Sequence, residues 1–360
     1  MSEWKDLVFL LSDLLQGQLA SIEVLPGGLE EWEGIEVPPE AEKPSSRFPF
    51  VLVEGNLGIP KKVLYAVYMA AVNIPWRSSD ARAANAATSI IILLNPAHQT
   101  ALNHRKHLIR DGQLDAAKEL LFTEHSARGS PEFGKQSMIW DHRRWCFGQI
   151  YGIIGSAVRV PYLMHWASSD EAQIFPRMNP SAIQHELDIL EKTCEAYPRN
   201  YHGWSHWHLM INICFASIHL SEDSATKRRF FGIIEQAYTR LGSWVERHVG
   251  DYSAMHQRCL TQTLIEHLTR IELFTTDIAN TNTLTVFALA DHAESLVIAY
   301  PAHESVWMYL RVSMARLSPE SRAEIRERVR NRSVSQRNFH LRLFEDWCSR
   351  PRGNTIHEEV

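Results

Sequence analysis

Three closely spaced histidines, His202, His206 and His208, are the residues whose spacing most directly suggests chemistry. In a helix, His202 and His206 lie one turn apart on the same face, where two imidazoles could hold a zinc ion. The five cysteines are dispersed and include no C-x-x-C pair. The chain therefore has no coherent set of zinc ligands, and we expect no metal site in it.

A short pattern that contains two of these histidines recurs along the chain. A polar segment with Pro, Asn or Asp is followed by an aromatic residue, then His or Asn, then Arg. The clear copies span 140–144, 200–206 and 301–307, and degenerate copies span 95–106 and 251–258. If Leu102, Trp140, Trp204, Met255 and Trp307 are equivalent, the spacing ranges from 38 residues (102 to 140) to 64 residues (140 to 204). Recurrence at this scale predicts stacked helical hairpins rather than one central core.

The recurring side chains are typical of structural positions. Proline, Asn and Asp suit the start of a helix, and a Trp buries a large area against the neighbouring hairpin. An Arg three residues later lies one turn on, where its planar fork could bond the polar turn of the adjacent repeat. We assign a structural role to these residues: Trp140, Arg143, Trp204, His206 and Trp307, with Arg105 and Arg258 in the degenerate copies.

The fold class we predict is all-α, an α–α superhelix of helical-hairpin repeats. Apolar residues recur with helical spacing in 7–19, 61–72, 80–94, 101–110 and 188–196. Asn95-Pro96 and Tyr197-Pro198 are helix stop signals, and the absence of alternating Val/Ile/Thr segments argues against a sheet. We expect an N-terminal helix with a Pro/Glu-rich strap at 1–60, the repeat array at 61–348, and a flexible tail at 349–360.

Bulk properties narrow the function classes. The chain has 360 residues and a net charge of −5, which gives no electrostatic footprint for nucleic acid. The odd, dispersed cysteines argue against a disulfide framework and fit a reducing compartment. The N-terminal residues lack the pattern of a signal peptide, and no apolar run is long enough to span a membrane. We expect a cytoplasmic protein.

The ordered motifs resemble the alpha subunits of protein prenyltransferases, whose repeat reads approximately Pro-Lys-Asn-Tyr-x-x-Trp-x-His-Arg-Arg. Residues 197–206 and 139–145 are similar to it, and 49–57, 93–96, 248–251 and 300–304 carry the resemblance further, toward the type III geranylgeranyltransferase branch. The resemblance implies a right-handed crescent wrapped around a separate beta subunit of the Rab geranylgeranyltransferase type. That partner would hold the zinc and the isoprenoid pocket, so this chain needs no cofactor of its own and is expected to be inactive alone.

The resemblance also implies which residues reach the seam between the subunits. Lys135, five residues before Trp140, matches a lysine that faces the diphosphate of the geranylgeranyl donor. Tyr201 and His202 match catalytic positions, and Asn200 and Arg199 match substrate-binding positions. Thiolate attack by a C-terminal cysteine of the protein substrate builds negative charge on the departing diphosphate, and such donors stabilise that charge.

Three departures from the family pattern affect these expectations. Gln136-Ser137 stands where Asn-Tyr is usual, so a tyrosine contact is absent there. Trp207 replaces an arginine in the third repeat, and Leu102 replaces a Trp in the first. We expect the side-chain contacts that fix one repeat against the next to differ at these positions.

Other readings stay open at this stage. The chain could be a catalytically silent scaffold whose repeats bind proteins, or, less favoured, an independent metal-dependent enzyme. An insertion is expected within 151–180, and a polar break at 221–229. The arginines between 322 and 342 fit a solvated final helix, with a partner-contact face as the alternative.

Overall fold

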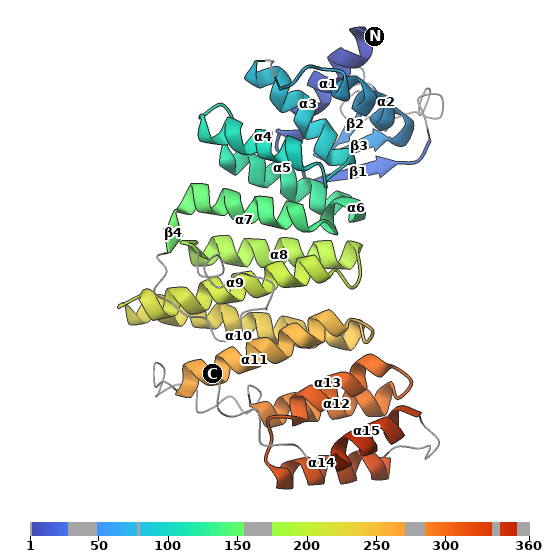
Figure 1. The fold of residues 1–360 in the computed structure, drawn as a ribbon, viewed down its shortest axis with the longest axis vertical. Helices are drawn as coiled ribbons and strands as arrows, with labels where there is room; N and C mark the ends of the chain where they lie inside the picture. Colours follow the sequence, from blue (N-terminus) through green and yellow to red (C-terminus); the bar gives the residue numbers. More distant parts are fainter. Residues whose placement is uncertain are drawn as a thin grey trace. The chain divides into compact units, whose positions relative to one another are not determined.

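The structure is a computed structural model that describes residues 2–27, 49–77, 80–154, 175–270, 285–332 and 339–350. These residues contain fifteen helices and five short strands (Figure 1). They form two compact units, and both α8 (Pro180–Ala196) and α9 (Tyr201–Leu220) contribute residues to each. The all-α repeat fold predicted from the sequence is confirmed.

The first unit contains seven further helices. α1, α2 and α3 pack against one another, α4 packs on α3, and α7 packs on α5. Their bounds are α1 (Ser2–Leu15), α2 (Lys61–Val72), α3 (Ala81–Leu94), α4 (Gln99–Arg110), α5 (Ala116–Gly129), α6 (Pro131–Gly134) and α7 (Ser137–Tyr151).

The second unit contains six further helices. α10 packs on α11, α13 packs on both α11 and α12, α14 packs on α12, and α15 packs on α13. Their bounds are α10 (Ser224–Arg247), α11 (Tyr252–Arg270), α12 (Val286–Ala299), α13 (Glu304–Met314), α14 (Pro319–Arg332) and α15 (Phe339–Ser349).

The helix starts follow from side-chain caps. Asp80 accepts a hydrogen bond from the Ala83 amide, Asp223 from the Thr226 amide, and Thr285 from the Ala288 amide. Each cap satisfies a backbone donor that the helix itself leaves unpaired. The predicted stops are confirmed, because α3 ends before Asn95-Pro96 and α8 ends before Tyr197-Pro198.

Several predicted boundaries differ from the structure. The first helix ends at Leu15 rather than Leu19, and α8 begins at Pro180, where the Asn179 side chain accepts from the Ala182 amide. The polar break is shorter than predicted, since capping by Asp223 starts α10 at Ser224. Residues 155–174 of the expected insertion, 28–48 of the strap and 351–360 of the tail lie outside the described residues.

The first unit also contains a small sheet that the sequence argument failed to predict. Strand β3 (Asn56–Pro60) pairs in parallel with β1 (Ser21–Leu25) and antiparallel with β2 (Val51–Val53). Strands this short show no clear alternation of apolar and polar residues, and β1 joins its partner from more than thirty residues away. Two further strands, β4 (Ile153–Ile154) and β5 (Phe175–Pro176), form a second sheet.

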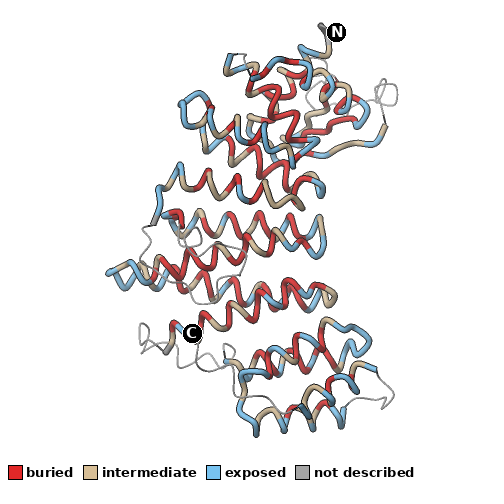
Figure 2. The backbone as a smooth tube through the Cα atoms, in the orientation of Figure 1, coloured by how far each residue is buried: buried red, intermediate tan, exposed pale blue. Residues whose placement is uncertain are grey.

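Buried positions recur along the helices and mark the packed faces (Figure 2). The five residues that we took as equivalent across the repeats, Leu102, Trp140, Trp204, Met255 and Trp307, lie in α4, α7, α9, α11 and α13 and are each at most 3% exposed. The repeat alignment therefore identified a core position in five helices.

Candidate functional site

The site centres on one backbone carbonyl, that of Gly134 at the end of α6. It accepts a hydrogen bond from Trp140 Nε1 at 2.8 Å and another from Asn200 Nδ2 at 3.0 Å. A Cβ on Gly134 would lie 2.5 Å from Thr193 Cγ2 of α8, so glycine is needed for this close approach. The carbonyl thus joins the second predicted repeat to the start of the third.

Lys135 follows Gly134 directly and is held at the surface. Its ammonium pairs with Glu132 and lies 5.9 Å from the centre of the Tyr197 ring. The hydrogen bond to Glu132 raises the pKa of Lys135, so the side chain stays protonated at neutral pH. Because 72% of the Glu132 side chain is exposed, this ion pair contributes little free energy and could give way to another anion.

Arg199 and Asn200 control the entry into α9. Arg199 is exposed and has a φ of 59°, a left-handed conformation that costs a non-glycine residue about 1 kcal/mol. Asn200 is 1% exposed, and its Oδ1 accepts from the Gly203 amide at 2.9 Å, which caps the helix. Both groups of the Asn200 amide are therefore engaged within the protein, and its predicted contact with substrate stays a prediction.

Tyr201 and His202 occupy the first turn of α9. Tyr201 is 47% exposed, and its ring meets the His202 ring edge-on with centroids 5.4 Å apart. The turn follows Asn200, which is bonded to the carbonyl preceding Lys135. Lys135 thus follows one partner of the Asn200–Gly134 hydrogen bond, and Tyr201 and His202 follow the other. The catalytic roles of these three residues stay predictions.

The remaining histidines of the string are core residues. The buried His206 ring packs against Trp140, with centroids 5.1 Å apart, and against Phe147 at 6.3 Å. His208 is also buried. Within the described part of the chain, no group of three or more His, Cys, Asp or Glu side chains is arranged to hold a metal ion.

Two of the repeat tryptophans make the same hydrogen bond to a carbonyl six residues earlier in the chain. Trp307 Nε1 donates to the Pro301 carbonyl at 2.9 Å, six residues back, as Trp140 does to Gly134. Trp204 is 1% exposed. Where the third repeat lacks the usual arginine, the buried Trp207 ring lies 5.4 Å from the guanidinium of Arg240, so a cation–π contact occupies that position.

The repeat arginines bond helices rather than turns, which corrects one expectation. Arg143 Nη1 donates to the Leu120 carbonyl and to Thr123 Oγ1, both at 2.7 Å and both within α5. A backbone carbonyl or a threonine hydroxyl within a helix can accept a hydrogen bond from a guanidinium, so α5 itself provides the partners of Arg143. The lock therefore lies between helix bodies.

Sequence reasoning missed a buried ionic cluster in the first unit. Arg105 forms a two-pronged pair with Glu119, at 2.9 and 2.5 Å, and His142 Nε2 lies 2.7 Å from Oε1 of the same carboxylate. Burial alone would raise the pKa of Glu119, but the charge and hydrogen bonds of Arg105, with those of His142, hold it well below its usual value. Glu119 lies outside every copy of the motif, so no local signal marked it.

A second missed network lies in the second unit. Arg258 bonds His292 Nδ1 and donates to the Tyr309 hydroxyl at 3.0 Å, and His292 Nε2 lies 3.2 Å from Glu246. Burial and the charge of Arg258 lower the pKa of His292 to about 4. A neutral His292 can accept from Arg258 and donate to Glu246, and it thereby links the cation to the anion.

None of the described helices is long and apolar enough to cross a membrane.

Comparison with known proteins identifies the repeat. The family model of the protein prenyltransferase alpha subunit repeat matches residues 183–214, which include Asn200, Tyr201 and His202. The match therefore covers α8 from Ile183 and the first part of α9, the segment that contacts Gly134.

Curated relatives extend the similarity. Protein prenyltransferase alpha subunit repeat-containing protein 1 of Danio rerio is 29% identical over 293 residues, which are 74% of this chain and 64% of that protein. The Homo sapiens protein of the same name is 28% identical over 239 residues, 61% of this chain and 53% of that protein. The geranylgeranyl transferase type-2 subunit alpha of Saccharomyces cerevisiae is 26% identical over 176 residues, 48% of this chain and 42% of that protein.

The chain thus spans less than two thirds of the length of each of these three relatives. The chain therefore carries a protein prenyltransferase alpha subunit repeat and is similar over most of its length to proteins named for that repeat, which confirms the family resemblance seen in its sequence.

Proposed function

We propose that this chain is the alpha subunit of a heterodimeric protein prenyltransferase, which transfers a geranylgeranyl group from its diphosphate to a C-terminal cysteine of a protein substrate. The observation that carries the proposal is the position of Lys135. Its partly exposed ammonium follows the carbonyl that ties α6 to α9, next to the segment matched by the family repeat.

The chemistry of the transfer needs cations and hydrogen-bond donors at the leaving group. The substrate sulfur forms a bond to the first carbon of the isoprenoid while the bond from that carbon to the diphosphate oxygen breaks. The bonding electrons leave with the diphosphate, whose negative charge grows in the transition state. The Lys135 ammonium, the Tyr201 hydroxyl and a ring N–H of His202 would stabilise that charge in the transition state.

The proposal divides the work between two chains. A beta subunit of the Rab geranylgeranyltransferase type would hold the isoprenoid, and zinc bound in that subunit would favour the thiolate form of the substrate cysteine. The present chain would supply the polar residues at the seam between the two subunits. We place the reaction in the cytoplasm. The five cysteines of the chain are free thiols, which supports a reducing compartment.

The test is co-expression with such a beta subunit, followed by size-exclusion chromatography and a labelled-lipid transfer assay. We expect a one-to-one complex with transfer activity, and Lys135→Ala should slow transfer by about 100-fold or more, the scale of losing one charge-stabilising donor. Lys118→Ala is the matched control, since Lys118 is an exposed lysine on α5. It should leave the rate unchanged.

Two outcomes count against the proposal. If the chain forms no complex with any prenyltransferase beta subunit, it is not a subunit of this enzyme class. If a complex forms and transfers lipid but Lys135→Ala and Lys118→Ala behave alike, Lys135 does not act on the diphosphate.

A catalytically silent scaffold is the second candidate, and one observation favours it. Tyr65, Met69 and Val72 lie on one face of α2, and each is at least 45% exposed. Apolar residues at this spacing form a surface suited to another protein. Stable complex formation without transfer in the same assay would support this reading.

A further inference from the structure

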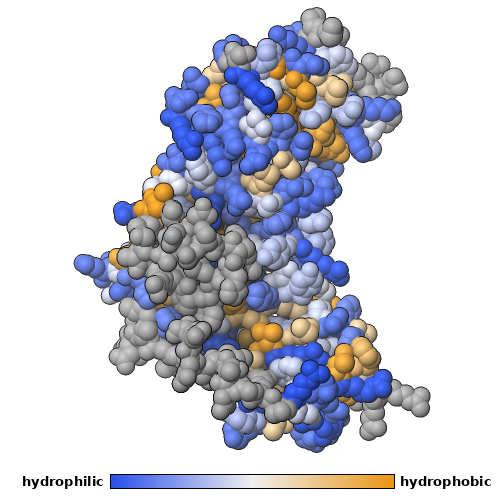
Figure 3. Space-filling view, in the orientation of Figure 1, coloured by the Kyte–Doolittle hydropathy of each residue, from blue (hydrophilic) through white to orange (hydrophobic). Residues whose placement is uncertain are grey.

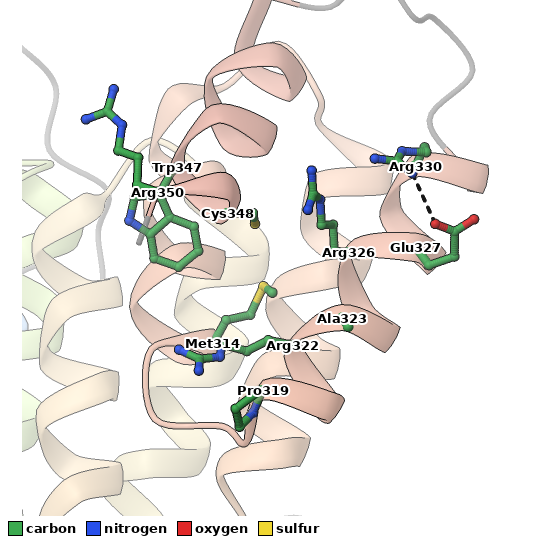
Figure 4. Close-up of a pocket in the computed structure, with 10 residues that line it drawn as sticks. All are labelled: Met314, Pro319, Arg322, Ala323, Arg326, Glu327, Arg330, Trp347, Cys348 and Arg350. Atoms are coloured by element: carbon green, nitrogen blue, oxygen red, sulfur yellow. Dashed lines mark hydrogen bonds and ion pairs between the residues drawn. The ribbon is translucent and has the colours of Figure 1, made fainter. Parts of the chain in front are cut away.

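The second unit contains an arginine-rich cavity of 550 Å³ between the end of α13, the helix α14 and the helix α15 (Figure 4). Four guanidinium-bearing residues line it: Arg322, Arg326 and Arg330 from α14, and Arg350 just after α15. In Figure 3, strongly hydrophilic side chains gather over this part of the chain. Glu327 is the one carboxylate among the lining residues, so the lining carries a net positive charge.

The three arginines of α14 form a ladder. They recur every four residues, so they share one helix face, with a rise of about 6 Å between successive Cα positions. Arg328, which lies off this face of α14, serves the fold instead, because it pairs with Asp291 and Glu294 of α12 at 2.5 Å. One helix therefore has an arginine face used for packing and another that lines the cavity.

Two rungs of the ladder have no carboxylate partner. Arg330 pairs with Glu345 and Glu327. Arg322 and Arg326, by contrast, form no ion pair within the residues that the structure describes. Arg326 donates only to Ser349 Oγ, at 3.2 Å, and its buried Nε has no hydrogen-bond partner there. Guanidinium groups so placed have donors available for an anion.

The cavity also has an apolar side. Trp347 of α15 lines it and stacks on Phe344, with centroids 6.1 Å apart, and the buried Met314 lines it from the end of α13. Figure 4 shows Trp347, with Arg350 beside it, across the cavity from Arg326 and Arg330. A ligand that filled the cavity would meet Arg326 and Arg330 on one side, and the Trp347 ring with Arg350 beside it on the other.

We propose that this cavity binds an extended acidic peptide segment of a partner protein. Side chains at alternate positions of an extended segment are about 6.6 Å apart, which is close to the rise between the ladder arginines. Carboxylates on one side of the segment would pair with Arg322 and Arg326, and an apolar side chain on the other would rest on Trp347. A single phosphate matches the site less well, because the Cα positions of the three ladder arginines span about 12 Å along α14, which one phosphate cannot bridge.

The test uses the full chain and a fluorescent peptide of about ten residues, with glutamate at alternate positions and a phenylalanine between two of them. We expect saturable binding in fluorescence anisotropy with a Kd below about 100 µM, weakened by added salt. A peptide of the same composition with its glutamates consecutive should bind several times more weakly.

Variants locate the site. Arg322→Gln should weaken binding by about three- to tenfold, the range for a charge-assisted hydrogen bond at a partly exposed site. Arg322 contacts no carboxylate, so this variant should fold normally, as circular dichroism can verify. Arg342→Gln, on the exposed surface of α15, removes the same charge outside the cavity and should change the Kd by less than about twofold.

Three results would overturn the proposal. The first is no saturable binding of the alternating peptide at physiological salt. The second is equal weakening by Arg322→Gln and Arg342→Gln, which would mean that net charge alone attracts the peptide. The third is full competition by inorganic phosphate at the peptide's own concentration, which would mean a point-anion site.

Discussion

Asn200 and Gly134 meet in a buried hydrogen bond of 3.0 Å, in which the side-chain amide of one predicted repeat donates to the last carbonyl of α6 in the repeat before it. The same asparagine caps α9 through its Oδ1. The residue thus sets both where α9 starts and where that start lies relative to Lys135. The buried Asn200 side chain can position the exposed residues around it in this way, because its two hydrogen bonds, to Gly134 and to Gly203, share one rigid amide group.

Replacing Asn200 with alanine should lower the free energy of unfolding by about 2 kcal/mol, because the change removes a helix cap and a buried hydrogen bond together. Asn200→Ser should recover part of this loss, since a serine hydroxyl can cap α9 but is too short to reach Gly134. Urea denaturation followed by circular dichroism measures both. Asn103→Ala, at an exposed position of α4, is the control and should change stability little.

Gly129→Ala tests the contact between α5 and the small sheet. A Cβ on Gly129 would lie 2.0 Å from the Ile22 carbonyl oxygen of β1, so the helix or the strand must move. We expect a loss of about 1–3 kcal/mol in the free energy of unfolding, the usual cost of overpacking. In Gly232→Ala a Cβ meets nothing within 4 Å, and this helical control should be neutral or stabilising. Equal stability of the two variants would argue against a tight α5–β1 contact.

The same region marks the limit of what the sequence could predict. Helix periodicity and Pro stop signals identified α2 with its observed bounds and the ends of α3 and α8, because both signals are local. The parallel pairing of β1 with β3 depends on a contact between distant segments, and no window of the sequence contains it. The same holds for the candidate site: the family motif selected Lys135 and residues 199–202, but the Gly134 carbonyl that joins them is a backbone group without a sequence signature.

Glu119→Gln should be strongly destabilising, because it leaves the buried Arg105 without its countercharge. Breaking one side of a buried ion pair costs about 3–5 kcal/mol. The pKa of Glu119 is lower in the folded protein than in the unfolded chain, so its contribution is present above the unfolded value of 4.5 and falls as the pH drops below it. Urea midpoints at pH 7 and pH 4 measure this. Glu119→Gln should show a smaller drop between the two pH values than the wild type, and an equal drop would assign the acid sensitivity to other groups.

His292 should make the second unit sensitive to mild acid. Its pKa is about 4 in the folded protein, against the usual histidine value of 6.5 that applies to the unfolded chain. The unfolded chain therefore binds the proton first as the pH falls. The stability from neutral His292 is therefore complete above pH 6.5 and is lost from there down to about pH 4, with a slope of at most about 1.4 kcal/mol per pH unit for one linked proton. Protonation would also take the acceptor at Nδ1 away from Arg258 and place two cations side by side. Urea titrations between pH 7 and pH 5 should show this slope in the wild type and a reduced slope in His292→Asn, whereas His303→Asn, at an exposed histidine before α13, should keep it.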